Sequence, residues 1–305
     1  MKIKVKNTIP VYDICALADT RHLNTDIIAE QFGHYLDRHP GLKFPHRHSF
    51  YHMVYFAGGS GTHSIDFQEF PVTPGQIYFM APGQVHSWFF DSKPEGYIIN
   101  FPEALMHSFL REGQYLDQFS FFSGHAADCV VMLREERDAV VQLLQQIVNE
   151  VGAGALFSMD MVRAALLTLF IRVAREAAPG TSRKVVAPNQ VLLHNFRKLV
   201  EQHYNTLRLP KDYAQLLYIT PNHLNALCSD LLGKPAGVII RDRILLEAQR
   251  MLVSSGADIA EIAALLNFSD NSYFTKFFKK YAGTTPENFR SAAGEKLKDN
   301  VRTKK

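Results

Sequence analysis

Two stretches of the sequence follow the same plan: YAQLLYITPNHLNALCSDLLG at residues 213–233 and IAALLNFSDNSYFTKFFKKYAG at residues 262–283. Each begins with apolar residues at helical spacing, passes through a short polar turn, resumes as a second amphipathic helix and ends in a glycine. The pattern occurs twice, about fifty residues apart, as in a structural repeat. It predicts two helix-turn-helix units in the C-terminal part of the chain.

The turn residues agree with this prediction. Thr220 is a good N-cap for the second helix of the first unit, and Pro221 suits the first position of that helix. In the second unit, Asn267 can adopt the left-handed conformation and Ser269 can cap the following helix. These residues give a physical reason for the two helices of each unit to meet at an angle.

The second helix of each unit has an apolar face and a polar face. The predicted buried residues are Leu224, Leu227, Cys228 and Leu231 in the first unit, and Tyr273, Phe274, Phe277, Phe278 and Tyr281 in the second. Asparagine can contact adenine edges and lysine can contact guanine or phosphate, so the polar face suits a DNA major groove. The predicted DNA-binding residues are Thr220, Asn222, His223, Asn225, Ala226, Ser229, Asn271, Ser272, Thr275, Lys276 and Lys279.

The alternative is that these polar residues only solvate a surface. The distribution of charge favours DNA binding, because residues 189–305 hold 17 Lys and Arg against 11 Asp and Glu, a net charge of +6. The preceding 188 residues hold 16 against 19, a net charge of −3. A basic module beside a mildly acidic one is what binding to phosphates requires.

The C-terminal sequence resembles the AraC/XylS family of transcriptional regulators. The resemblance is carried by residues 219–225, 240–252, 259–263, 267–279 and 283–286, together with Phe289 and Arg290. It implies that a long helix, at about residues 238–253, joins the two units and sets the recognition helices roughly 34 Å apart, in successive major grooves. It also implies an organic effector bound without metal in the N-terminal barrel, contact with RNA polymerase and, as in most of the family, transcriptional activation.

Three residues depart from the family pattern. Ala226 stands where the family usually has arginine, Ser229 where it usually has lysine, and Asn267 at the customary glycine. We therefore expect the second unit to anchor on phosphates. The first unit is expected to read bases through Asn222 and Asn225.

The N-terminal part has a different character. Residues 44–101 are rich in aromatic and β-branched residues and are interrupted by Gly and Pro, which predicts short antiparallel strands. Amphipathic helices are predicted at 134–150 and 157–177. The predicted fold class is α+β: a cupin-like β-barrel with two following helices at residues 1–177, a linker at 178–188, an all-α DNA-binding domain at 189–292 and a basic disordered tail at 293–305.

One strand of this region carries several histidines. In FPHRHSFYHMVYF, residues 44–56, a period of two puts three histidines on one face, and residues 74–86 resemble the second half of a cupin motif. A small barrel lined by these side chains is expected. The predicted effector-binding residues are His46, His48, Phe50, His52, Val54, His63, Ile65, Phe79, His86 and Trp88.

The histidines leave three interpretations open. They could hold an organic effector, aromatic or carboxylic, or they could be structural. The third interpretation is that His46, His48, His52 and His86 bind a metal ion. Cupin enzymes do so with an HxH pair, a glutamate and a later histidine, and His52 stands at the glutamate position here. The expected state is an effector pocket without metal or other cofactor. The alternative function is a metal-dependent cupin enzyme with an accessory DNA-binding tail. No GxSxG, Walker or HExxH motif is present, so hydrolase, nucleotide-binding and metalloprotease functions have no motif support.

The remaining sequence features limit where the protein is located and what it binds. No apolar run is long enough to span a membrane, no secretion signal is recognisable, and three scattered cysteines do not form a disulfide framework. We expect a soluble, cytoplasmic protein without membrane contact. Its expected partners are double-stranded DNA, a small-molecule effector, RNA polymerase and a second copy of the chain bound through the N-terminal domain. The apolar face of residues 157–177 is wide enough to pair with that second copy, and the alternative is that it packs on its own barrel.

Overall fold

The computed structural model describes residues 9–18, 27–107, 115–123, 126–177 and 188–293. Contacts within the chain divide it into two units, one formed by Pro10–Thr181 and the other by Met1–Ile9 with Ser182–Lys305. The predicted linker (178–188) and the predicted tail (293–305) lie outside the described residues, apart from Pro188 and Ala293.

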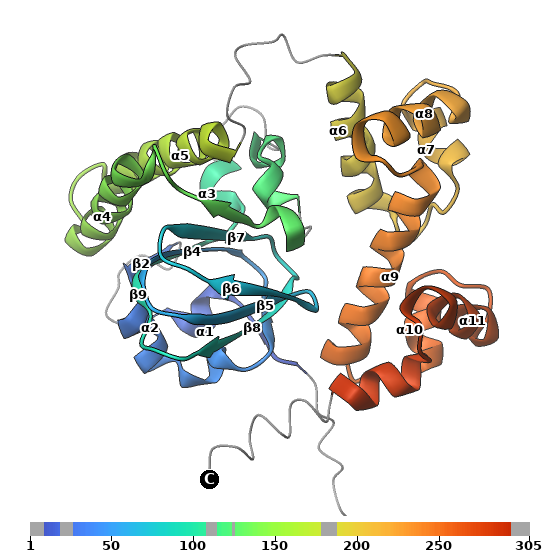
Figure 1. The fold of residues 1–305 in the computed structure, drawn as a ribbon, viewed down its shortest axis with the longest axis horizontal. Helices are drawn as coiled ribbons and strands as arrows, with labels where there is room; N and C mark the ends of the chain where they lie inside the picture. The colour runs from blue at the N-terminus through green and yellow to red at the C-terminus, as the bar shows by residue number, and fades with distance from the viewer. Residues whose placement is uncertain (1–8, 19–26, 108–114, 124–125, 178–187, 294–305) are drawn as a thin grey trace, which may run out of the picture. The chain divides into compact units, whose positions relative to one another are not determined.

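The first unit contains two five-stranded sheets, with strand orders β1-β3-β8-β5-β6 and β10-β7-β4-β9-β2 (Figure 1). Nearly all neighbouring strands are antiparallel, and the exception is the short parallel pair β1–β3. The strands are β1 (Val11–Tyr12), β2 (Ile28–Gln31), β3 (His46–His48), β4 (Tyr51–Gly58), β5 (Gly61–Ile65), β6 (Gln68–Val72), β7 (Gln76–Met80), β8 (Val85–Phe90), β9 (Glu95–Phe101) and β10 (Val130–Met132).

Side chains that alternate along β4 separate two hydrophobic cores. Val54 and Phe56 point into a core shared with residues of the other sheet, such as Trp88. Met53 and Tyr55 belong to a second core on the opposite face. This alternation is the period-two geometry of a strand that is buried on both faces.

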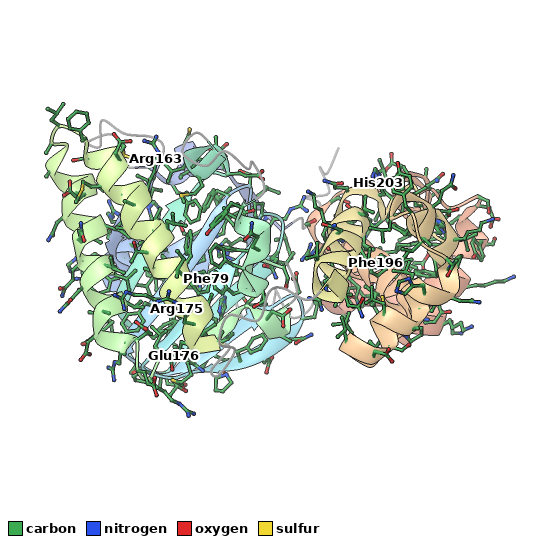
Figure 2. The ribbon with its side chains drawn as sticks, turned by 90° about the horizontal axis from the view of Figure 1, so that it is seen from above. Phe79, Arg163, Arg175, Glu176, Phe196 and His203 are labelled. Atoms are coloured by element: carbon green, nitrogen blue, oxygen red, sulfur yellow. The ribbon has the colours of Figure 1, made fainter. Side chains whose placement is uncertain are left out.

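The helices of the first unit lie against these sheets. They are α1 (Ile14–Leu17), α2 (Phe32–Arg38), α3 (Ala104–His107), α4 (Arg137–Ala153) and α5 (Ser158–Ala177), with 3₁₀ turns at Pro40–Lys43, Tyr115–Gln118, Ser120–Phe122 and Ala126–Asp128. Leu144 of α4 and Phe170 of α5 are buried in the core that also contains Met53 and Tyr55. The two long helices therefore cover the outer face of the β4 sheet (Figures 1 and 2).

One glycine is required by close backbone packing in this unit. Gly96 has φ +142°, and a Cβ added there would lie 1.9 Å from the carbonyl oxygen of Tyr55. Gly96 pairs with Phe56 next to a bulge in β4, where the register shifts between Phe56 and Gly58. Only glycine allows the two strands to approach this closely.

The second unit is helical. Its elements are α6 (Pro188–His203), α7 (Pro210–Leu216), α8 (Pro221–Leu232), α9 (Ala236–Ser254), α10 (Ile259–Leu265) and α11 (Asn271–Ala282). Phe196 of α6, Ile240 of α9, and Phe278 of α11 are buried in one core. The α+β fold class, with a strand-rich part followed by helices, is confirmed.

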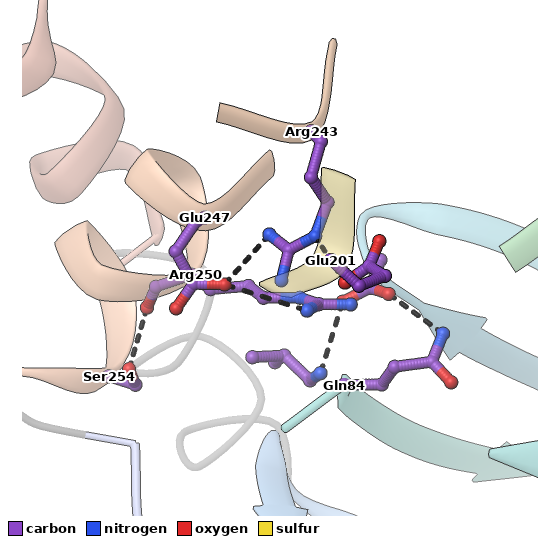
Figure 3. A network of polar contacts seen from close by, with 8 residues as sticks. Gln84, Glu201, Arg243, Glu247, Arg250 and Ser254 are labelled. Carbon is purple, nitrogen blue, oxygen red and sulfur yellow. Dashed lines mark hydrogen bonds and ion pairs between the residues drawn. The ribbon is translucent and has the colours of Figure 1, made fainter. Parts of the chain in front are cut away.

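A buried arginine ties α9 to α6. The Nε–H of Arg243 donates to Glu201 (2.7 Å) and its Nη1 donates to Glu247 (3.0 Å), as Figure 3 shows. The guanidinium also lies over the ring of Tyr204, 4.0 Å from its centroid. A charge that is 8 % exposed is therefore satisfied by two carboxylates and a ring face.

Among the helices of the described ranges, none has both the length and the apolar character of a membrane span.

Candidate functional site

Helices α7 and α8 form the first helix-turn-helix unit. Thr220 caps α8, since its hydroxyl accepts a hydrogen bond from the backbone N–H of His223 (3.2 Å), and Pro221 occupies the first position of α8. Tyr218 turns the chain with φ +55°, in the left-handed region. Gly233 ends α8 with φ +68°. The predicted cap, first helical residue and glycine stop are all present.

Helices α10 and α11 repeat this arrangement with one difference. The turn residue is Asn267, with φ +56°, and Gly283 ends α11 with φ +77°. Five residues separate α10 from α11, whereas four separate α7 from α8. The cap is Asp270, whose carboxylate accepts from the backbone N–H of Tyr273 (2.7 Å). The prediction that Ser269 caps this helix is wrong, because the extra residue moves the cap one position along.

The buried stripes of α8 and α11 are narrower than predicted. Leu224, Leu227 and Cys228 are buried in α8, and Phe274 and Phe278 are buried in α11, with Phe277 partly buried. The other three predicted core residues are exposed, namely Leu231 (43 %), Tyr273 (53 %) and Tyr281 (37 %). They lie at the margins of the stripe, where the neighbouring helices do not cover them.

The outward faces of the two helices differ in charge. Each helix has twelve residues, but α8 contains one Asp and no Lys or Arg, whereas α11 contains Lys276, Lys279 and Lys280 and no acidic residue. The formal charges are therefore −1 and +3. Lys276 and Lys279 are exposed, and within the described part of the chain neither forms an ion pair. Their ammonium groups are available to bind an anion.

The other predicted DNA-binding residues are placed as follows. Asn222, His223, Ala226 and Ser229 are exposed on α8, and Asn271 and Ser272 are exposed on α11, while Thr275 is half-buried. Asn225 is also half-buried, and its side-chain oxygen accepts a hydrogen bond from the backbone N–H of Ala236 (3.1 Å) at the start of α9. The carboxamide of Asn225 thus joins α8 to α9, and its oxygen is not free to face a groove.

The predicted effector residues lie in the interior of the first unit. Five histidines from four strands meet there: His46 and His48 on β3, His52 on β4, His63 on β5 and His86 on β8. Each is at most 3 % exposed. His46 is the register partner of His86, and the ring centroids of these two residues are 4.2 Å apart. The ring of His48 lies 4.9 Å from His52 and 5.0 Å from His86.

Apolar rings and branched side chains surround the histidines. The Trp88 ring stacks on His63 with centroids 3.3 Å apart, and the Phe50 ring lies 4.4 Å from His48. Val54 and Ile65 are fully buried in the same core. The structure therefore brings together nine of the ten predicted effector residues.

Phe79 is the exception, and the prediction that it lines this interior is wrong. It lies on the opposite face of β7, where its ring stacks on Phe121 (centroids 4.0 Å apart) beneath α5 (Figure 2). The inward residues of β7 are Tyr78 and Met80. A shift of one residue along a strand moves a side chain to the other face, and the sequence of β7, apolar at four successive positions, does not mark the inward set.

Several residues of this interior were not predicted, among them Asn100 and Tyr78. Asn100 on β9 accepts a hydrogen bond from Nδ1 of His52 (2.6 Å) and donates one to the Tyr35 hydroxyl (3.1 Å). The ring of Tyr78 lies 4.9 Å from that of His63. Asn100 could have been found as the one polar residue in the apolar strand YIINF, since a buried amide requires partners.

Burial keeps the histidines neutral. It lowers the pKa of His46 to about 4 and that of His52 to about 3, although hydrogen bonds to Phe44 and Asn100 oppose the shift. Burial also lowers the pKa of His48, His63 and His86 well below the usual value, and the neighbouring imidazoles add to this effect. At neutral pH each ring therefore offers one N–H donor and one nitrogen lone pair.

Comparison with known families identifies both units. Residues 32–171 match a family model described as an AraC-like ligand binding domain, and residues 213–292 match one described as a helix-turn-helix domain. The chain belongs to the AraC family of transcriptional regulators. It is a regulator with a ligand-binding domain and a helix-turn-helix DNA-binding domain, and the resemblance seen in its sequence is confirmed.

Individual AraC-family relatives align along most of the chain. The arabinose operon regulatory protein of Escherichia coli (strain K12) is 23 % identical over 252 residues, which are 79 % of this chain and 80 % of that protein. The HTH-type transcriptional activator RhaR of Mannheimia succiniciproducens is 20 % identical over 261 residues, 83 % of this chain and 90 % of that protein. Both are named as regulators.

A solved structure is also similar. It is unsaturated fatty acid bound wild-type ToxT from Vibrio cholerae strain SCE256, with a TM-score of 0.43 and 12 % sequence identity. The alignment covers 89 % of this chain and 97 % of that chain.

Proposed function

We propose that this regulator activates transcription by placing α8 and α11 in the DNA major groove, with α11 held by phosphates and α8 selecting base pairs. The observation that carries the proposal is the contrast in charge between two helices on similar scaffolds, −1 on α8 and +3 on α11. Phosphate contacts supply affinity without sequence information, whereas contacts to base edges supply specificity.

The residues proposed to read bases are Asn222 and His223. Both are exposed in the first turn of α8, and the N-terminal residues of a recognition helix are those that reach base edges. For Asn225 we propose a positioning role in place of the base contact that its position in the sequence favoured. Its side-chain oxygen holds the backbone of Ala236, so it positions α8 against α9 instead of contacting a base.

On α11, Asn271 and Ser272 occupy the equivalent first turn, and Lys276 and Lys279 lie further along the same exposed face. Lys276 and Lys279 stand fifty positions after Ala226 and Ser229, which are their counterparts in α8. We assign the two lysines to phosphate contacts.

The proposed control is by an organic effector bound among the histidines of the first unit. Binding changes transcription only if the effector prefers one arrangement of the two units over the other. The activator assignment is supported by the name of the relative RhaR. Contact with RNA polymerase, pairing with a second copy of the chain and a cytoplasmic location belong to the same proposal.

Selection of binding sites from a random duplex library tests the DNA-binding part. The expected product is a strong half-motif read by α8, with a weaker base preference centred about 10 base pairs away, one helical turn, where α11 binds. Asn222→Ala should relax preference at one base pair, by about 1 to 3 kcal/mol for a lost bidentate contact, whereas Asn225→Ala should leave the selected motif unchanged. A motif that is insensitive to Asn222→Ala and His223→Ala would contradict the assignment of α8.

Effector control is tested separately. Compounds that raise the melting temperature of the protein are identified first, and operator affinity and promoter output are then measured with each. If none changes either quantity, effector control should be abandoned while the DNA-binding assignment stands.

A further inference from the structure

The histidines of the first unit leave several ring nitrogens without a hydrogen-bond partner. These atoms are Nδ1 of His48, Nε2 of His52, Nδ1 of His63 and Nε2 of His86, all buried, and none has a partner among the described residues. Buried polar groups in folded proteins are nearly always hydrogen-bonded. Four exceptions in one cluster indicate that something else belongs there.

The hydrogen bonds that are present determine which nitrogens carry lone pairs. Nδ1 of His46 lies 2.7 Å from the carbonyl oxygen of Phe44, so Nδ1 is the donor and the neutral ring has its lone pair on Nε2. That Nε2 lies 3.2 Å from Nε2 of His48. In His86, Nδ1 is engaged with Nε2 of His63 (3.1 Å), which leaves Nε2 of His86 as its free nitrogen.

We propose that the interior of the first unit binds one divalent transition-metal ion through His46, His48 and His86. One ring nitrogen from each of these residues lies within 4.8 Å of the other two. An ion with metal–nitrogen bonds of about 2.0 to 2.1 Å in tetrahedral geometry holds its ligand nitrogens about 3.4 Å apart. The Nε2 atoms of His46 and His48, 3.2 Å apart, are close to this spacing. Ion binding would replace the hydrogen bond between them, with the His48 proton moving from Nε2 to Nδ1, and rotation of the His86 ring would bring the third nitrogen into place.

The surroundings of two of the three rings, those of His46 and His86, resemble those of ligands prepared for a metal. A metal-bound histidine usually donates its other N–H to a carbonyl, carboxylate or water, which fixes the tautomer. The carbonyl of Phe44 does this for His46, and the ring of His63 can do it for His86. A set of three imidazoles suits zinc, iron, nickel or copper rather than magnesium or calcium.

His52 is not included among the ligands, because the ring nitrogens that lie within 4.8 Å of one another belong to His46, His48 and His86. Three protein ligands leave the fourth position of a tetrahedral ion open to water or to an oxygen atom of another molecule. A bound cation would attract a carboxylate more strongly than the neutral rings do, since each of those rings offers an N–H donor but no charge. The idea that the ion binds the carboxylate of the effector rests on the proposed function, whereas the metal site itself does not.

Metal titration of the full chain tests the inference. The protein is treated with chelator, dialysed and titrated with Zn²⁺ by calorimetry and with Co²⁺ by visible absorption. We expect one ion per chain and Co²⁺ bands of a tetrahedral site. His46→Gln with His86→Gln should weaken binding by more than about 100-fold, since loss even of an outer partner costs 10- to 100-fold. His34→Gln, an exposed histidine of the same unit, is the matched control and should bind normally.

Each outcome has a consequence. Binding below 0.2 equivalents in the wild-type protein, or equal loss in the control variant, overturns the inference and leaves the DNA-binding proposal untouched. If the double variant does not fold, X-ray absorption of the Zn²⁺-loaded wild-type protein decides. Three imidazole nitrogens at about 2.0 Å support the site, and a shell of oxygen atoms alone refutes it.

Discussion

Replacing Lys276 and Lys279 by alanine should weaken DNA binding and flatten its dependence on salt. Both side chains are exposed on one face of α11, and among the described residues neither gives up an ion pair when it binds a phosphate. Each phosphate contact adds about 0.9 to the slope of log affinity against log salt. The double variant should therefore lose about 1.8 from the slope. Between 50 and 200 mM salt, the difference in affinity from wild type should shrink roughly twelvefold.

The measurement needs no knowledge of the operator, because phosphate contacts do not depend on sequence. Fluorescence anisotropy with a random-sequence duplex at several salt concentrations gives the slope directly. Arg134→Ala with Arg175→Ala is the control, since it removes the same charge from exposed positions of the ligand-binding unit. The reciprocal variant, Ala226→Lys with Ser229→Lys, places lysines at the equivalent positions of α8 and should steepen the slope by a similar amount.

The reasoning is refuted if the Lys276 and Lys279 double variant keeps the slope of the wild-type protein. In that case the lysines lie away from the backbone, and α11 does not anchor the complex. A parallel loss of slope in both variants would instead mean that net charge, rather than the face of α11, governs binding.

Three further predictions concern stability, each measured by thermal or denaturant unfolding. Asp270→Ala should cost about 1 kcal/mol through loss of the α11 cap, whereas Ser269→Ala should cost less than about 0.5 kcal/mol, and equal costs would contradict the assigned cap. Tyr218→Asn should stabilise the first turn by up to about 1 kcal/mol, because asparagine tolerates the left-handed region better, and a loss of stability would contradict this. Arg243→Ala should cost about 2 to 3 kcal/mol, at or below the lower end of the range of about 3 to 5 kcal/mol for a broken buried pair, because Glu201 is 44 % exposed. A cost below about 0.5 kcal/mol would show that the network adds nothing.

The helical elements were predictable because their signals are local. Thr220, Pro221 and the glycines that follow α8 and α11 mark helix ends by their own chemistry, independent of the rest of the fold. The long helix predicted at about 238–253 is observed at Ala236–Ser254. The barrel histidines were also predictable, since period two along residues 46–56 survives the bend between β3 and β4.

What the sequence did not indicate depends on neighbours that are distant in the chain. Tyr273 and Tyr281 belong to the apolar stripe of α11 by spacing, but their exposure depends on how far the adjacent helices extend. Asn225 has the composition of a base-reading residue, and only the approach of Ala236 shows that its oxygen is occupied. The division of ten strands into two sheets likewise depends on long-range pairing, and β1 and β2 carry too few residues for a pattern to be recognised.

The strand β4 has a consequence for how this regulator tolerates mutation. Six successive residues, Tyr51 to Phe56, are buried, with alternate side chains in two separate cores. A saturation-mutagenesis map should therefore show that substitutions are poorly tolerated at all six positions. A strand with one solvent-exposed face would instead tolerate them at every second position. Substitutions at Met53 and Tyr55 should loosen the packing of α4 and α5 on the sheet. Substitutions at His52 and Val54 should instead disturb the core around the histidines.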